Sequence, residues 1–353
     1  MQRREFFGLA GWSLAALAVG CARPPDLGKK LLITLDPQTG ATRNTQEVSL
    51  PKGNRTPCAS ARHGFLLAKG QSVLAVSFSG QSCLCNGPDN ALWVRADLLV
   101  TAEKTSSDLF RVSGQRFPDG RILWQKDLGY GHLLGFDSQA VYVSHPKGIS
   151  CFELESGTER WVNGELSELQ SWLVTPSSLV VGLGNAGRVS WLNLTDGKVQ
   201  RTLTTTTTPN RVILLAGDDE YTFTLTRRIA MATFRPNQST PLWIQPITGQ
   251  DHQAQLLGYA DRIALVELHE STVAVDIATG GTLWSDSLAT HLSICRDVVL
   301  LRRGRGTGGG KMSLELEARQ LRSGKSLWKR ELEDLHTATA SSVDQFFLLT
   351  EPV

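Results

Sequence analysis

A turn that ends in glycine recurs about every 40 residues along almost the whole chain, and this spacing limits the possible folds most strongly. In the clearest copy, apolar residues alternate over 273–277 and Trp284 follows Gly280 by four positions. The turn glycines are Gly40, Gly80, Gly120, Gly157, Gly197, Gly280 and Gly324, and Ser239-Thr240 occupies the remaining place. A period of ~40–45 residues is typical of a four-stranded propeller blade.

Each copy of the repeat predicts a β-hairpin, because glycine adopts positive φ at little cost and strands alternate with period two. Two apolar segments that precede each hairpin, such as 133–134 and 140–143, predict the inner strands of the blade. The chain begins with an outer hairpin over 31–48 and ends with an inner hairpin over 336–349. Joined, these two hairpins make one composite blade that closes the ring and protects its edges. The sequence therefore predicts an all-β, eight-bladed propeller of four-stranded antiparallel blades.

The first 20 residues have the pattern of an export signal. Two arginines precede an apolar run over 6–19, which is shorter than the ~20 residues of a membrane-spanning helix. The start is similar to a twin-arginine export motif, whose elements here are Arg3, Arg4, Phe6 and Phe7. The alternative is an ordinary secretory leader that contains two arginines.

A lipid-attachment motif follows the apolar run. The residues of 18–21, Ala-Val-Gly-Cys, resemble a lipobox, in which Cys21 becomes the lipidated first residue of the mature protein. Two acyl chains would hold the protein stably at a membrane surface. The expected organisation is a signal peptide at 1–20, a lipidated cysteine and tether at 21–30, and a single propeller domain at 31–353.

Charge and cysteine content narrow the possible partners. The chain has 36 basic and 34 acidic side chains, a balance that favours neither nucleic acid nor an acidic membrane as its partner. The basic segment 302–311 is interpreted as a long flexible loop between the second and third strands of one blade, which could contact a partner or a headgroup; the alternative is a loop that is only solvated. Besides Cys21 there are five cysteines, Cys58, Cys83, Cys85, Cys151 and Cys295. Cys151 and Cys295 lie in apolar strands and are expected to be buried, and a bond between Cys83 and Cys85 stays open.

Four histidines occupy nearly the same position in their blades, where the innermost strand begins: His132, His252, His291 and His336. Starts of innermost strands surround one mouth of a propeller's central channel, so these imidazoles could together bind a divalent metal or an anion. The alternative is a polar lining of the channel mouth that binds nothing. A carboxylate that would orient the rings of a metal site is not evident at a matching position.

The repeat Asp-x-x-Thr-Gly-x-x-x-Trp, seen at 276–284, resembles the pyrroloquinoline-quinone-type (PQQ-type) propeller repeat, and the resemblance covers essentially the whole mature chain. In that family the tryptophan docks between adjacent blades. The resemblance implies this role for Trp124, Trp161, Trp243, Trp284 and Trp328. Asn44, Leu84 and Arg201 occupy the matching positions elsewhere, so these three junctions are expected to pack differently.

Two kinds of PQQ-repeat protein offer competing functions. Quinone-dependent dehydrogenases resemble this chain in blade number, but they carry an adjacent Cys-Cys pair and long insertions around the cofactor. This chain has Cys83-Leu84-Cys85 and short blades, so PQQ binding is not expected. A lipid-anchored propeller of this repeat type is similar to BamB-like lipoproteins of the outer-membrane assembly machine, which present loops on one face to a partner. That resemblance implies a non-catalytic scaffold in the cell envelope, a monomer within a complex. A ligand- or metal-binding periplasmic receptor remains the alternative.

Overall fold

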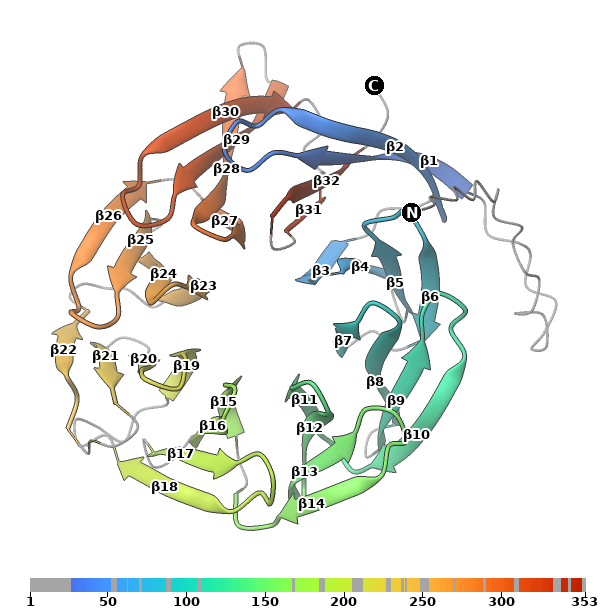
Figure 1. Ribbon diagram of the computed structural model, residues 1–353, viewed down its shortest axis with the longest axis vertical. Helices are drawn as coiled ribbons and strands as arrows, with labels where there is room; N and C mark the ends of the chain where they lie inside the picture. The colour runs from blue at the N-terminus through green and yellow to red at the C-terminus, as the bar shows by residue number, and fades with distance from the viewer. Residues whose placement is uncertain are drawn as a thin grey trace, which may run out of the picture.

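The protein is a closed ring of eight four-stranded antiparallel sheets, seen in a computed structural model (Figure 1). The residues described are 27–350, apart from short segments: 52–55, 62, 70–71, 87–89, 107–108, 167–168, 184–187, 205–211, 227–229, 236–237, 239, 248–253, 269–270, 288–289, 308–310, 333–337 and 342–343. None of the described residues is helical. The eight-bladed propeller predicted from the repeat is confirmed.

Seven blades are continuous in sequence, and each is written here from its innermost to its outermost strand. The first three are β3 (Thr56–Ala61), β4 (Gly64–Lys69), β5 (Ser72–Ser77) and β6 (Ser82–Asn86); β7 (Asn90–Arg95), β8 (Leu98–Ser106), β9 (Leu109–Arg116) and β10 (Ile122–Leu128); and β11 (His132–Phe136), β12 (Ala140–His145), β13 (Gly148–Glu153) and β14 (Glu159–Asn163). The next two are β15 (Leu169–Val174), β16 (Ser178–Leu183), β17 (Arg188–Asn193) and β18 (Val199–Thr204); and β19 (Val212–Gly217), β20 (Thr222–Thr226), β21 (Ala230–Phe234) and β22 (Trp243–Pro246). The last two are β23 (Gln255–Ala260), β24 (Ile263–Leu268), β25 (Ser271–Asp276) and β26 (Thr282–Ser287); and β27 (Thr290–Cys295), β28 (Val298–Thr307), β29 (Lys311–Gln320) and β30 (Ser326–Leu332).

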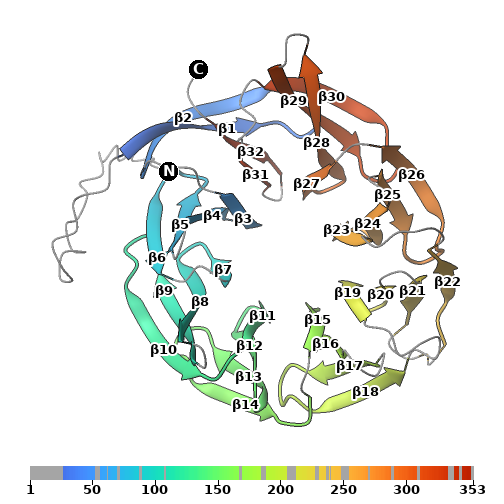
Figure 2. The ribbon, with the colours of Figure 1, turned by 180° about the vertical axis from the view of Figure 1, so that it is seen from behind.

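The eighth blade combines the two ends of the described chain, as the sequence predicts. Its order is β31 (Ala338–Ser341), β32 (Phe346–Thr350), β1 (Leu27–Leu35) and β2 (Thr42–Pro51). The central pairing of β1 with β32 runs from Leu31↔Thr350 to Leu35↔Phe346. On the far side of this blade, β31 contacts β3, so the ring closes through the terminal strands, as both views show (Figure 2).

The core lies between blades, where side chains from neighbouring sheets meet. The second strands are buried almost without interruption, as over 140–144, 178–183 and 263–266. The apolar clusters each combine strands of two adjacent blades; one runs from Leu134 in β11 to Leu192 in β17. This arrangement follows from the period-two pattern, because both faces of each blade are covered by another sheet.

Most blades contain a bulge just after the turn glycine, in the pairing of the third strand with the fourth. In blade β11–β14, for example, Phe152 pairs with Glu159 and Cys151 with Trp161, so one residue of β14 is skipped. Blade β3–β6 has no such shift, and there Ala75 pairs with Cys83. A one-residue change of register exchanges the two faces of a strand, and this difference decides which side chain of β6 meets the next blade.

Two expectations about segment boundaries need correction. The basic segment 302–311 was expected to be a loop, but β28 continues to Thr307 and β29 begins at Lys311, with residues 308–310 outside the described part. Paired backbone hydrogen bonds extend this ribbon despite its glycine content. In addition, β1 begins at Leu27, so residues 27–30 of the expected tether belong to the sheet. Over the described ranges, there is no helix of sufficient length and apolarity to cross a membrane.

Candidate interaction surface

One face of the ring consists of the turns that join first to second strands and third to fourth strands, and is here called the turn face. In five blades the two turns are hydrogen-bonded to each other; in blade β11–β14 the Leu154 N–H donates to the Gln139 carbonyl at 3.0 Å. The third-to-fourth turn closes on itself as well, since Gly157 N–H donates to the Glu153 carbonyl at 2.9 Å. The turn face is therefore a hydrogen-bonded platform.

Five blade junctions at this face contain a tryptophan from the fourth strand. In each, the indole Nε1–H donates to a backbone carbonyl in the third-to-fourth turn of the next blade. The pairs are Trp124 with Leu154 at 2.7 Å, Trp161 with Leu194 at 2.8 Å, Trp243 with Ile277 at 2.8 Å, Trp284 with Leu321 at 2.7 Å and Trp328 with Pro37 at 2.7 Å. The last pair joins the C-terminal part of the chain to its N-terminal strands. A partly buried indole combines apolar area with one directed donor, so it fixes both the distance and the rotation between blades.

The same five tryptophans lie against the turn glycines of the following blade. A Cβ added at Gly157 would stand 2.6 Å from Trp124 Cδ2, and one at Gly197 would stand 2.3 Å from Trp161 Cε3. These glycines have φ of 65° and 69°, so the turn alone already favours glycine. The ring contact is a second reason for glycine, which the repeat pattern in the sequence did not indicate.

An arginine occupies the junction after blade β15–β18. Arg201 Nη1 donates to the Arg235 carbonyl at 3.0 Å, and its Nη2 donates to the Gln238 carbonyl. The guanidinium carbon lies 5.1 Å from the ring centroid of Trp191. Arg201 thus donates to the next blade's turn as the indoles do, from the same repeat position. Burial lowers the pKa of this guanidinium, which nevertheless stays charged.

The other two junctions use residues one or two positions away from the expected ones. In β2, Gln46 lies two residues beyond Asn44; its Nε2 donates to the Ser79 carbonyl at 3.3 Å and packs against Gly80. In β6, Cys83 rather than Leu84 faces the neighbouring blade. Its Sγ would lie 3.1 Å from a Cβ at Gly120. Cys83 is buried in an apolar cluster that includes Phe117 of the next blade.

A network of six charged side chains, centred on the buried Glu315 and Glu317, forms a second connection between blades β23–β26 and β27–β30. Arg303 Nη2 lies 2.6 Å from Asp286 Oδ2 and 2.7 Å from Glu317 Oε2, and Arg319 bridges the same two carboxylates. Glu315 and Lys329 complete the network, in which three positive side chains face three negative ones. Burial alone would raise the pKa of Glu317, but hydrogen bonds from Arg319 and Ser326 and the nearby arginine charges outweigh it, so this pKa is lowered.

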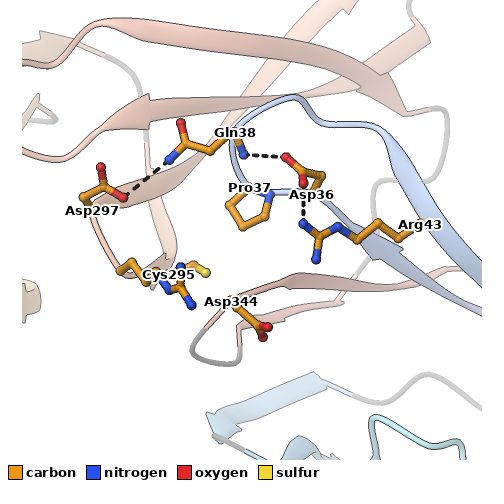
Figure 3. A pocket seen from close by; sticks show the side chains of 8 residues that line it. Asp36, Pro37, Gln38, Arg43, Cys295, Asp297 and Asp344 are labelled. Atoms are coloured by element: carbon orange, nitrogen blue, oxygen red, sulfur yellow. Dashed lines mark hydrogen bonds and ion pairs between the residues drawn. The ribbon is translucent and has the colours of Figure 1, made fainter.

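Two polar hollows open on the turn face at equivalent places in the repeat. The first, of ≈ 210 Å³, lies between blade β27–β30 and the composite blade, and its charged lining residues are Asp36, Arg43, Arg296, Asp297 and Asp344 (Figure 3). The second, of ≈ 330 Å³, lies between blades β7–β10 and β11–β14 and is lined by Arg95, Gln139, Glu153, Glu155 and Arg160 among others. Each combines two first-to-second turns with the next blade's outer hairpin.

Contacts within the hollows hold most of these side chains in place. Gln38 Nε2 donates to Asp297 Oδ1 at 3.4 Å across the first junction, and Arg95 Nη2 lies 2.5 Å from Glu155 Oε1 across the second. Hydrogen bonds from Arg43 and from the Thr39 N–H lower the pKa of Asp36 to about 2. Cys295 lines the first hollow. Burial raises the pKa of its thiol to about 11, so this thiol is not a thiolate nucleophile at neutral pH. Such hollows suit polar recognition of a partner's side chains.

The histidine cluster expected at the channel mouth is described only in part. His132 lies at the start of β11, where its ring stacks on Trp172 of the next blade at 6.1 Å and meets Tyr130 edge-on at 5.3 Å. His291 is the second residue of β27, and His252 and His336 lie outside the described residues. Among the residues that are described, no group of three or more His, Cys, Asp or Glu side chains could hold a metal ion. Cys21 and the export residues Arg3, Arg4, Phe6 and Phe7 also lie outside the described part.

Comparison with known proteins gives one family match. The family model described as outer membrane protein assembly factor BamB matches residues 185–348, which is somewhat less than half of the chain and runs from β17 to β32. No curated protein sequence is significantly similar to the chain.

Three solved structures share the fold at low sequence identity. BamB from Moraxella catarrhalis is 14% identical with a TM-score of 0.50, and the match covers 92% of this chain and 100% of that one. The computationally designed Ika8 protein is 14% identical with a TM-score of 0.56, over 85% and 100% of the two chains. Kluyveromyces lactis Hsv2p is 8% identical with a TM-score of 0.56, over 79% and 98%. The repeat and the eight-bladed ring show a PQQ-type propeller, and the family match over 185–348 makes its second half similar to BamB-family proteins.

Proposed function

We propose that this protein is a non-catalytic, lipid-anchored scaffold of the cell envelope that takes part in outer-membrane protein assembly. The match of residues 185–348 to the BamB family is the observation that carries this proposal. The anchor would be Cys21, the protein would face the periplasm, and in a cell with two membranes the outer one would carry the lipid. The protein would act as a monomer within a complex of envelope proteins.

The turn face is our proposed docking surface for the partner protein. Its turns are fixed by hydrogen bonds within and between blades, so a partner meets a surface that loses little conformational freedom on binding. Its two hollows offer both signs of charge, with Arg95 and Arg160 beside Glu153 and Glu155 in the second. Mixed polar surfaces of this kind give specificity and orientation to a protein interface.

The position of Cys83 argues against the dehydrogenase alternative. In quinone enzymes of this repeat type a pair of adjacent cysteines lies over the cofactor. Here Cys83 packs between two blades against Gly120, in an apolar cluster with Leu66 and Leu99, where it has a structural role.

Photo-crosslinking in the native host tests the proposal directly. A benzophenone amino acid would be introduced at exposed turn-face positions beside the hollows, Gln38 and Gln139, and at the matched position Lys147 on the opposite face. We expect Gln38 or Gln139 to crosslink to a component of outer-membrane assembly and Lys147 to give no such product. Crosslinks to that component from Lys147 alone would move the docking surface to the other face. The absence of any envelope-protein crosslink from all three positions would contradict the scaffold function.

A further inference from the structure

The junction between blades β15–β18 and β19–β22 leaves two apolar side chains exposed at the edge of the turn face. Ile244 in β22 is 47% exposed, and Leu242, just before that strand, is 36% exposed. Within the part of the chain that the structure describes, no other two exposed large apolar residues lie so close in sequence. Exposed apolar side chains that occur together, rather than singly, are typical of a surface that binds a partner.

Buried apolar residues of both blades adjoin this exposed pair. The cluster between the two blades includes Leu203 of β18 and Ala232 and Phe234 of β21. Ala232 and Ile244 are partners in the pairing of β21 with β22, so their side chains lie on the same face of the blade. Strands β18 and β22 follow each other along the outside of the ring (Figure 1). The core of this junction therefore continues to the surface at Ile244.

Two arginines at the same junction carry positive charge. Arg235 begins the third-to-fourth turn of blade β19–β22, and its guanidinium carbon lies 5.7 Å from the ring centroid of Tyr221. The Nη1 and Nη2 groups of Arg201 donate to backbone carbonyls of that turn, which are uncharged. Over the described residues neither arginine forms an ion pair, and the segments 199–204 and 235–246 contain no acidic residue. Burial lowers the pKa of Arg201, and no carboxylate opposes this shift.

The carboxylates in the first-to-second turn of blade β19–β22 are already occupied. Glu220 Oε2 lies 2.5 Å from Arg262 Nη2. Asp219 accepts hydrogen bonds from hydroxyl groups of the preceding blade, and Asp218 accepts one from the Tyr259 hydroxyl at 2.9 Å. The two arginines of the junction are therefore left to pair with a carboxylate from another molecule.

We propose that Arg201, Arg235, Leu242 and Ile244, here called the arginine patch, bind a segment of the partner protein in which an acidic side chain is flanked by apolar ones. The inference rests on the proposed function for the existence of a partner, and it adds the chemistry of the segment that is bound. The partner's carboxylate pairs with the guanidinium groups, whose planar N–H donors match it in shape. The flanking apolar side chains cover Leu242 and Ile244 and exclude water, which strengthens the charge pair.

Photo-crosslinking of the full-length protein in its native host tests the chemistry of the bound segment. A benzophenone amino acid would be placed at Thr240, an exposed residue two positions before Leu242. The crosslinked peptides would be sequenced by mass spectrometry after digestion. We expect a segment of an envelope protein that carries Asp or Glu beside apolar residues. A crosslinked segment without an acidic residue would overturn the proposal.

A double variant and a matched control test the patch itself. Arg235→Glu with Ile244→Gln should lower the crosslink yield at Thr240 at least about tenfold, because a charge attraction becomes a repulsion and apolar contact is lost. Arg121→Glu with Ile122→Gln makes the same change beside the third-to-fourth turn of blade β7–β10, where both residues are also exposed, and should leave the yield unchanged. Urea unfolding of both variants verifies that they fold. An unchanged yield in the first variant, or an equal loss in both, would refute the patch.

A charge exchange and the other turn-face positions complete the test. In the single variant Arg235→Glu, replacing the crosslinked acidic residue of the partner by arginine should restore the yield; no recovery would show that the two side chains do not pair. If Gln38 or Gln139 crosslinks to an assembly component while Thr240 crosslinks to nothing, the patch is wrong and the scaffold function stands. If none of the three positions crosslinks to an envelope protein, the inference and the proposed function fall together.

Discussion

The junction after blade β11–β14 and the next junction along the ring join the same structural elements in different ways. At the first, Trp161 packs on Gly197 and donates one hydrogen bond to the Leu194 carbonyl. At the second, Arg201 donates to two carbonyls of a turn over 235–242 that has no glycine. Both residues direct a donor from the fourth strand to the neighbouring turn. The first junction draws its stability mainly from buried apolar area, the second from charged hydrogen bonds, so the two should respond differently to substitution.

Removing the indole from a tryptophan junction should have the largest effect. We expect Trp161→Ala to reduce the free energy of unfolding by about 3–5 kcal/mol, because a large buried side chain leaves a cavity between blades. Trp161→Phe keeps most of the apolar area and should cost less, about 1–2 kcal/mol, through the lost hydrogen bond to Leu194 and a smaller void. Urea unfolding gives both values. Equal losses for the two variants would show that the hydrogen bond, not the packing, dominates the junction.

Substituting the turn glycines should separate backbone strain from contact with the indole. Gly157 and Gly120 have similar φ, 65° and 70°, but only Gly157 faces a tryptophan, Trp124. Gly120→Ala should cost about 1–2 kcal/mol, mainly from the left-handed conformation, because the added Cβ would meet only the Cys83 Sγ, at 3.1 Å. Gly157→Ala should cost about 2–4 kcal/mol, because overpacking against the ring is added. Thermal or urea unfolding of the two variants measures the difference, and a difference of zero would remove the ring contact from the account.

Substituting the arginine should have a smaller effect than removing a tryptophan. We expect Arg201→Ala to cost about 1–2 kcal/mol, since its hydrogen bonds are partly exposed to solvent. Arg201→Trp should not restore a tryptophan junction, because residues 235–242 offer no glycine for the ring to lie against. Urea unfolding checks both variants. Stability at or above that of the unaltered protein for Arg201→Trp would show that the glycine is dispensable.

Acid should weaken the ring-closing junction, and this should be the smallest of the four effects. The folded pKa of Asp36, beside the Trp328 contact, is about 2 against an ordinary 3.8. Its stabilising contribution is therefore complete above about pH 4 and is lost as pH falls toward 2. We expect about 1 kcal/mol from this partly exposed group, after solvent screening. Urea unfolding between pH 2 and 5 should show a shallower pH dependence for Asp36→Asn; an identical dependence would contradict the assignment.

The period of about 40 residues predicted the ring, its blade number and its composite blade, because each repeat can bury its apolar faces only against its neighbours. The details of three junctions could not be predicted in the same way. Cys83 replaces Leu84 because β6 lacks the usual bulge, and a bulge is set by backbone hydrogen bonds rather than by a residue pattern. Gln46 replaces Asn44 because the longer side chain reaches the Ser79 carbonyl. Five turn glycines contact a tryptophan that lies 33–40 residues earlier or, for Gly40, near the other end of the chain, and these contacts depend on how the blades pack.

The surface features of the ring were harder to predict from the sequence than the fold. The hollows of the turn face combine turns from two blades, and no single repeat copy shows their lining. The basic segment 302–311 was expected to be a loop because glycine is frequent there, whereas the register makes most of it a projecting ribbon. His132 begins β11, where its ring stacks on Trp172 of the next blade, a contact between blades that the sequence pattern did not indicate.

Affinity purification from native membranes tests the central claim most directly. The lipidated protein would be crosslinked in place, gently solubilised and purified, and the product analysed by mass spectrometry for proteins and for bound quinone and metal. The scaffold account predicts an outer-membrane assembly protein in stable association, with neither quinone nor metal in stoichiometric amount. Stoichiometric quinone or metal without a stable protein partner would contradict it and would assign the function to the channel mouth and its histidines.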